Sequence, residues 1–183
     1  MYELDSLITN WTNGLSGHNP LLDDALILVT NFGVPIMVVA VAAQWWIGTD
    51  RPRVRHAAVA CGLSFLLGLA VNQLILLFLH RARPYDVGLT HLLLTPTADP
   101  SFPSDHATAS FAIVFGYLLN GRLRAAALSL VGALIIGFSR IYVGTHYLSD
   151  ILGGAATALL GAAIVRAMYR KGTRLDRWVV SVM

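Results

Sequence analysis

AAVACGLSFLLGLAVNQLILLFL, from Ala57 to Leu79, decides the fold class of this chain. The stretch contains no charged residue, and about 20 apolar residues in helical form are enough to cross the hydrocarbon core of a bilayer. A helix satisfies its backbone hydrogen bonds within the segment itself, which lipid requires. We therefore expect a membrane-spanning helix here.

Four further stretches are apolar enough to accompany it. They run from Leu22 to Ile47, His106 to Leu119, Ala125 to Phe138 and Leu148 to Met168. The two that begin at His106 and Ala125 are short, and they suffice as spans where their ends face a polar cavity. The composition agrees, since 56% of the 183 residues are hydrophobic and only 13% are charged. We expect an all-α, polytopic membrane bundle of about five spans, forming one domain over residues 1–183.

The segment before the first of these spans has a different pattern. Apolar residues recur there at helical spacing, with polar residues between them; they are Leu4, Leu7, Ile8, Trp11 and Leu15. This pattern is typical of a helix that lies on the membrane surface. It also fits a helix that packs into the bundle.

The basic residues lie at the ends of the spans and indicate a direction across the membrane. Short loops rich in Lys and Arg stay in the cytoplasm. One orientation places ten of the thirteen basic residues there: Arg51, Arg53, Arg55, Arg122, Arg124, Arg166, Arg170, Lys171, Arg174 and Arg177. This orientation predicts an outside N-terminus and a cytoplasmic C-terminus in a cell (inner) membrane. The net charge of +3 then reflects topology rather than binding of nucleic acid.

The other three arginines lie on the outer side, although Lys and Arg generally favour the cytoplasmic side. They are Arg81, Arg83 and Arg140, and three histidines accompany them: His80, His106 and His146. Four prolines oppose a regular helix between Arg81 and Asp105. We expect three segments to meet on this side, HRARPYD (80–86), FPSDH (102–106) and SRIYVGTHYLSD (139–150), and to form a reactive site that binds an anion.

The arginines of this side have the chemistry of a phosphate site. Arg83 and Arg140 carry guanidinium groups that form forked hydrogen bonds to phosphate oxygens and remain charged. Ser104 precedes an apolar run at an expected helix start, where free backbone N–H groups bind phosphate; it can also act simply as a helix cap. The alternative for the arginines is that they extend to water or pair with Asp86 and Asp150.

The histidines add a reactive pair. His146 and Asp150 are four residues apart, so a helix would place them on one face, and the carboxylate can accept the proton of one imidazole nitrogen. The other nitrogen is then available to attack phosphorus and form a phosphohistidine, which divides hydrolysis into two displacements. His106 can protonate the leaving oxygen and afterwards activate water.

These segments resemble the signature of the type 2 phosphatidic acid phosphatase (PAP2) superfamily, KxxxxxxRP, PSGH and SRxxxxxHxxxD. The third motif matches at each fixed position: Ser139, Arg140, His146 and Asp150. Asp105 stands where the second motif has glycine, and Leu76 stands where the first has lysine. The resemblance implies a PAP2-like fold, phosphate binding by the matched residues, His146 as nucleophile, His106 as general acid, and neither a metal nor another cofactor.

The segments RARPY and FPSDHATASF, together with the small size, also resemble the short bacterial undecaprenyl pyrophosphate phosphatases of the BcrC type. This resemblance implies hydrolysis of undecaprenyl diphosphate to undecaprenyl phosphate outside the cytoplasm, in the recycling of the carrier lipid of cell-wall synthesis. The partners would be this polyprenyl lipid phosphate and membrane lipids, and Arg81 and His80 would contact the second phosphate.

Two alternatives stay open. A phosphatidic acid or phosphatidylglycerophosphate phosphatase of the same superfamily would use the same catalytic residues. A membrane transporter could use the basic vestibule to bind anions without breaking a bond, although transport has no need of an oriented histidine.

Overall fold

Helices form all the regular structure in the part of the chain that the computed structural model describes, residues 2–47 and 50–181. They are α1 (Tyr2–Asn13), α2 (Pro20–Ala43), α3 (Arg51–Leu76), α4 (Asp105–Leu119), α5 (Leu123–Tyr142), α6 (Leu148–Met168) and α7 (Arg174–Ser181). The expected all-α class is confirmed.

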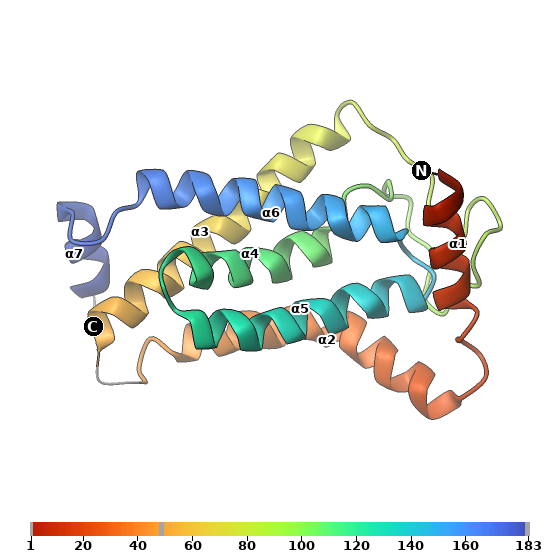
Figure 1. Ribbon diagram of the computed structural model, residues 1–183, viewed down its shortest axis with the longest axis horizontal. Coiled ribbons are helices and arrows are strands. Elements are labelled where there is room, and N and C mark those ends of the chain that lie inside the picture. Colours follow the sequence, from red (N-terminus) through yellow and green to blue (C-terminus); the bar gives the residue numbers. More distant parts are fainter. Residues whose placement is uncertain (1, 48–49, 182–183) are drawn as a thin grey trace.

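Helix α4 lies in the middle of the bundle among α2, α3, α5 and α6, while α1 and α7 lie at opposite ends (Figure 1). The four surrounding helices have the length and hydropathy to cross a membrane. Helix α4 has only 15 residues, and ten of them are buried. Because protein rather than lipid encloses α4, it does not need the full length of a span. The five expected spans are therefore four long helices around a shorter one.

Three of the spanning helices have ends that differ from the expected ranges. Helix α2 ends at Ala43 rather than Ile47, and α3 ends at Leu76 rather than Leu79. Helix α3 begins at Arg51, before the apolar stretch, because the side chain of Asp50 accepts a hydrogen bond from the backbone N–H of Arg53 at 3.4 Å. Helix α5 continues past Phe138 to Tyr142, and this last turn is buried. Its polar residues face protein, so the end of the apolar run did not mark the end of the helix.

The short helix α7 was not expected, and a buried histidine joins it to the bundle. Nδ1 of His56 lies 2.7 Å from Asp176 Oδ1, and Nε2 lies 3.1 Å from Asn120 Oδ1. Asn120 donates its own amide to the Gly116 carbonyl at 2.8 Å, which turns its oxygen toward His56. The ring also stacks on Tyr169. The two ring nitrogens of His56 therefore connect α3 to α7 and to the end of α4.

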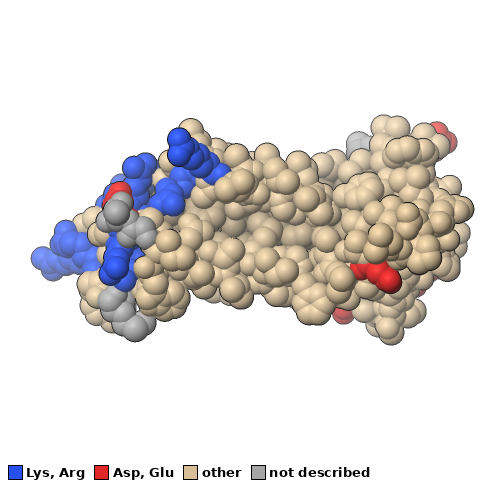
Figure 2. All heavy atoms as spheres, turned by 90° about the horizontal axis from the view of Figure 1, so that it is seen from below, with Lys and Arg blue, Asp and Glu red and all other residues tan. Residues whose placement is uncertain are grey.

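The charges divide the molecule into two ends. Figure 2 shows that the Lys and Arg side chains visible on this face gather at one end, while acidic side chains are visible at the other. The basic end carries α7, and the opposite end carries α1 and the connection from α3 to α4 (Figure 1). The ends of the bundle therefore differ in charge as the sequence indicates.

Helices α3, α4 and α6 approach one another at glycines. A Cβ atom on Gly161 of α6 would lie 2.9 Å from the backbone nitrogen of Gly68 in α3. A Cβ atom on Gly154 would lie 2.6 Å from the carbonyl oxygen of Ser104, directly before α4. Small residues thus set the separation of these helices, as is common in membrane bundles.

Replacement of Gly161 by alanine should lower the thermal unfolding midpoint, because the new Cβ meets backbone atoms that cannot move aside. Overpacking of this kind costs about 1–3 kcal/mol. Gly62→Ala in α3 is the matched control, since nothing lies within 4 Å of its Cβ position. Alanine is favoured there by roughly 0.5–1 kcal/mol. Thermal unfolding in detergent should move the two variants in opposite directions, and a stabilised Gly161→Ala protein would contradict the packing argument.

Candidate functional site

The three polar segments meet at the end of the bundle that carries α1. Between α3 and α4 the chain forms turns and extended structure, as its prolines indicate. This connection packs on the loop from α5 to α6, where the Leu93 N–H donates to the Val143 carbonyl at 3.1 Å. Gly144 in that loop has a φ of +84°, and a Cβ atom there would collide with the carbonyl oxygen of His91. Only glycine fits this turn, which directs the chain to His146.

His146 lies in the loop before α6 rather than within a helix, which corrects the expected geometry. Its Nδ1 is 2.9 Å from the carbonyl oxygen of Ser101 and 3.4 Å from Oδ2 of Asp150. The Ser101 carbonyl is therefore the main acceptor of the Nδ1 proton, and the carboxylate is the more distant one. In the neutral ring this arrangement leaves Nε2 unprotonated, 3.4 Å from Nη1 of Arg83.

Asp150 is completely buried in the first turn of α6 and joins the three segments. Its Oδ2 accepts hydrogen bonds from the Ser101 hydroxyl at 2.5 Å and from the Tyr147 N–H at 2.8 Å. Its Oδ1 accepts one from Arg81 at 2.8 Å. A buried carboxylate is tolerated only when donors compensate its lost hydration, and these three do so.

Arg83 and Arg140 are both buried beside the histidines. Arg83 donates from Nε to the Asp99 carbonyl at 2.8 Å and from Nη1 to the Thr145 carbonyl at 3.1 Å. Nε of Arg140 is buried and has no hydrogen-bond partner in the described part of the chain. Buried polar groups rarely lack partners, so an unmatched guanidinium donor is suited to an anionic ligand.

His106 is the second residue of α4 and is half-buried. Its side chain lies beside the backbone of Thr30 in α2, and its ionisable neighbours are Arg140, His146 and Arg83. The two histidines and two arginines thus form one cluster, drawn from the α3–α4 connection, α4, α5 and the α5–α6 loop.

Ser104 is the N-cap of α4, as expected, and its hydroxyl accepts from the Ala107 N–H at 3.4 Å. Its own N–H donates to the carbonyl of Asp150 at 3.1 Å. Asp105, which had no assigned role, accepts a hydrogen bond from Asn72 at 2.7 Å. Asn72 lies one turn before Leu76 on α3 and is fully buried. Polar residues are rare within apolar spans and often mark a functional site. The position of Asn72 in such a span could therefore have identified it from the sequence.

Arg81 and His80 have different surroundings from the other candidates. Nη1 of Arg81 donates to Asp150 at 2.8 Å, and Nη2 donates to Asp5 of α1 at 2.8 Å. Its guanidinium also lies over the ring of Tyr147, 3.7 Å from the centroid. His80 is exposed, and among residues 2–47 and 50–181 no hydrogen bond or ion pair joins it to the site. The structure therefore joins Arg81 to Asp150 and leaves His80 at the surface.

Burial and positive neighbours control the charge of His146. Burial lowers the pKa of His146 from 6.5 to about 4, and Arg140 and Arg83 act in the same direction. Asp150 opposes them without cancelling their effect. At neutral pH the imidazole is therefore uncharged and keeps a lone pair on Nε2. In the described residues no group of three or more His, Cys, Asp or Glu side chains could hold a metal ion.

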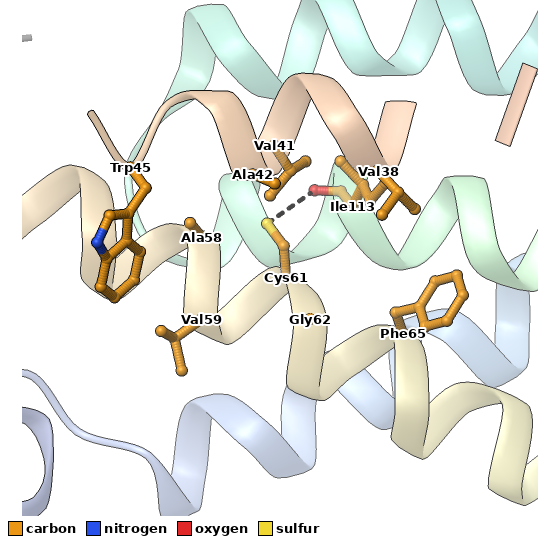
Figure 3. A pocket seen from close by; sticks show the side chains of 10 residues that line it. All are labelled: Val38, Val41, Ala42, Trp45, Ala58, Val59, Cys61, Gly62, Phe65 and Ile113. Carbon is orange, nitrogen blue, oxygen red and sulfur yellow. Dashed lines mark hydrogen bonds between the residues drawn. The ribbon is translucent and has the colours of Figure 1, made fainter. Parts of the chain in front are cut away.

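An apolar cavity of about 260 Å³ lies elsewhere in the bundle (Figure 3). Its walls come from α2, α3 and α4 and include Trp45, Cys61, Phe65 and Ile113. The thiol of Cys61 donates to the carbonyl of Ile113 at 3.6 Å, so this group is satisfied within the protein. The cavity offers no cationic side chain to a phosphate and is distinct from the histidine cluster.

Comparison with known proteins shows the family and the fold of the chain. Residues 57–174 match the PAP2 superfamily. The chain is 36% identical over 148 residues to undecaprenyl-diphosphatase BcrC of Bacillus subtilis, covering 81% of this chain and 75% of that protein. It is 25% identical over 167 residues to phosphatidylglycerophosphatase B of the same organism, covering 83% and 77%. The crystal structure of a PAP2-type phosphatidylglycerolphosphate phosphatase from Bacillus subtilis has the same fold, with a TM-score of 0.69, 21% identity, and coverage of 94% and 88%.

The depressed pKa of His146 predicts a loss of stability in acid. Unfolded His146 takes up a proton below pH 6.5, whereas the folded protein resists protonation until about pH 4. Stability should therefore fall as the pH drops through this window, by on the order of 3 kcal/mol from this residue. Thermal unfolding at pH 7 and pH 4.5 measures the effect. His146→Gln, which lacks this ionisation, should lose less stability than the wild type, and an equal loss would show that the depressed pKa is wrong.

Proposed function

The chain belongs to the PAP2 superfamily and is a multi-pass membrane lipid phosphatase, and from this premise we propose that it hydrolyses undecaprenyl diphosphate to undecaprenyl phosphate and phosphate. The observation that carries the proposal is the placement of His146, with Nε2 beside Arg83 and Nδ1 held by Ser101. The choice of substrate rests on the higher identity to the undecaprenyl-diphosphatase than to the phosphatidylglycerophosphatase.

Binding of the terminal phosphate is assigned to Arg83, Arg140 and the start of α4. The unmatched Nε of Arg140 supplies a donor that no protein group uses in the described structure. Arg83 adds a second guanidinium beside Nε2 of His146. Ser104 caps α4, whose remaining free N–H groups and dipole favour an anion at this point.

In the first step Nε2 of His146 attacks the terminal phosphorus. The N–P bond forms while the bond from phosphorus to the bridging oxygen breaks, and His106 donates a proton to the leaving undecaprenyl phosphate. Phosphorylation places positive charge on the imidazole. The Ser101 carbonyl and the Asp150 carboxylate on the Nδ1 side stabilise that charge.

In the second step water attacks the phosphohistidine. His106 accepts a proton from this water, the N–P bond breaks and phosphate leaves, so both histidines return to their initial state. Arg81 is assigned to the support of Asp150 because it donates to this carboxylate and to Asp5. Contact of His80 with the second phosphate stays a prediction, supported only by its exposed position in the same α3–α4 connection as Arg83.

We propose a location in the cell (inner) membrane, and the distribution of basic residues supports an orientation with the site on its outer face. Ten of the thirteen Lys and Arg residues belong to segments at the end opposite the histidine cluster, and short basic loops stay in the cytoplasm. This orientation puts α1 outside and α7 in the cytoplasm. The substrate would enter from the outer leaflet.

Phosphate release from purified protein tests the proposal, with chelator present and four substrates compared: undecaprenyl diphosphate, undecaprenyl phosphate, phosphatidic acid and phosphatidylglycerophosphate. We expect the highest kcat/KM for undecaprenyl diphosphate. His146→Asn should lower kcat by a factor on the order of 10³ or more, and His106→Asn by about 10²–10⁴.

The matched control is His18→Asn. His18 is exposed in the connection between α1 and α2, so this substitution should leave activity unchanged. Acid-labile, alkali-stable phosphate should be trapped on wild-type protein but not on His146→Asn. Preference for a glycerolipid would overturn the substrate, and full activity of His146→Asn would overturn the mechanism.

A further inference from the structure

Helix α1 has its polar side toward the protein and its apolar side outward. Asp5, Thr9 and Asn13 are each four residues apart and so share one face of the helix; Thr9 and Asn13 are buried. The opposite side carries large exposed residues: Leu4, Leu7 and Trp11 are 62%, 67% and 69% exposed. In a membrane protein such a stripe is suited to contact with lipid.

The polar face binds the loop that carries His146. Oδ1 of Asp5 accepts from the Ser149 N–H at 2.9 Å. Its Oδ2 accepts from the Ser149 hydroxyl at 2.5 Å and from Arg81 at 2.8 Å. Thr9 accepts from the Leu148 N–H at 3.3 Å. These bonds attach α1 to the segment directly after His146.

Asn13 fixes the other side of the same loop. Its amide donates to the carbonyls of Tyr142 and His91, both at 2.8 Å, and its oxygen accepts from the His91 N–H at 2.7 Å. The three polar residues of α1 thus hold the chain on both sides of His146, and Figure 1 shows α1 across the ends of α5 and α6.

These contacts add to the local cap of α6, in which Asp150 accepts from the Tyr147 N–H. The first N–H groups of a helix have no partner within that helix, and here α1 supplies acceptors to those of Leu148 and Ser149. A carboxylate at this position also interacts favourably with the positive end of the helix dipole. Burial would raise the pKa of Asp5, but its bonds to Arg81 and Ser149 outweigh burial and keep this pKa below the ordinary value.

We propose that Asp5 is a positioning residue of the phosphatase site, acting through Arg81 and Ser149 on the orientation of Asp150 and His146. Arg81 bridges the carboxylates of Asp5 and Asp150, and the Ser101 hydroxyl joins Asp150 to the segment whose carbonyl holds His146. The inference rests on the proposed function, since it requires His146 to react. It extends the site to a helix outside residues 57–174 and outside all three motifs.

Asp5→Asn tests the proposal, with Glu3→Gln as the matched control because Glu3 is an exposed acid on the same helix. Phosphate release from undecaprenyl diphosphate and thermal unfolding are measured for both. We expect Asp5→Asn to lower kcat about tenfold, which corresponds to about 1.4 kcal/mol, with KM within about twofold. Glu3→Gln should match the wild type in both measurements.

The pH profile distinguishes positioning from simple attachment of α1. Asp5→Asn removes a negative charge beside Arg81, and the uncompensated positive charge near His146 should move the acidic limb of kcat to lower pH. A residue that only attaches the helix would lower the unfolding midpoint and leave the acidic limb unchanged. An unshifted limb with normal kcat per folded molecule would overturn the proposal.

A parallel His146→Asn variant separates this inference from the function on which it rests. If His146→Asn is inactive and Asp5→Asn equals Glu3→Gln, only the role of Asp5 is wrong. If His146→Asn stays active, the proposed mechanism itself fails. Should Asp5→Asn not fold, Ser149→Ala applies the same test. It removes the hydroxyl that donates to Asp5 and accepts from Arg81, but keeps the Asp5–Arg81 ion pair. A lower kcat supports the proposal, and an unchanged kcat overturns it.

Discussion

The completely buried carboxylate of Asp150 determines how this end of the molecule is built. Loss of hydration must be compensated by donors, and those come from both ends of the α3–α4 connection, Arg81 and Ser101, and from the backbone of Tyr147 at the start of α6. Satisfying one charge therefore brings the two ends of the long connection to the start of α6, and Arg81 extends this link to Asp5 of α1. The orientation of His146 follows from this arrangement, because the carbonyl that holds Nδ1 belongs to Ser101.

The central position of α4 explains how a polar cluster exists beside apolar spans. The helix is shielded by its neighbours, so its first turn reaches the cluster while its other residues form the core. Glycines in α6 allow α3 and α4 to approach closely, and Gly154 leaves room for the turn that begins α4. The close packing of α4 against α6 therefore also determines where His106, in the first turn of α4, is placed.

Local patterns were enough to predict the class of fold, the spans and the meeting of the three segments. Apolar stretches indicate which segments form helices in lipid, where backbone groups must bond within the segment. Prolines indicate where a helix cannot continue. The partners of individual side chains depend on contacts between distant segments, so they could not be predicted. Spacing suggested that Asp150 orients His146, whereas the carbonyl of Ser101 lies closer to Nδ1 of His146. Every residue has a backbone carbonyl, so no residue type in the sequence could identify this acceptor. Asp5 and Asn72 had no recognisable motif.

The contacts of α7 also show that the two ends of the bundle are closed in a similar way. Asp176 of α7 lies 2.7 Å from His56 of α3 and accepts hydrogen bonds from the Tyr169 hydroxyl at 2.7 Å and the Gly172 N–H at 2.6 Å. At the opposite end Asp5 of α1 accepts from Arg81 and Ser149. At each end a short helix therefore contributes one carboxylate that connects it to a longer helix and to the loop beside that helix.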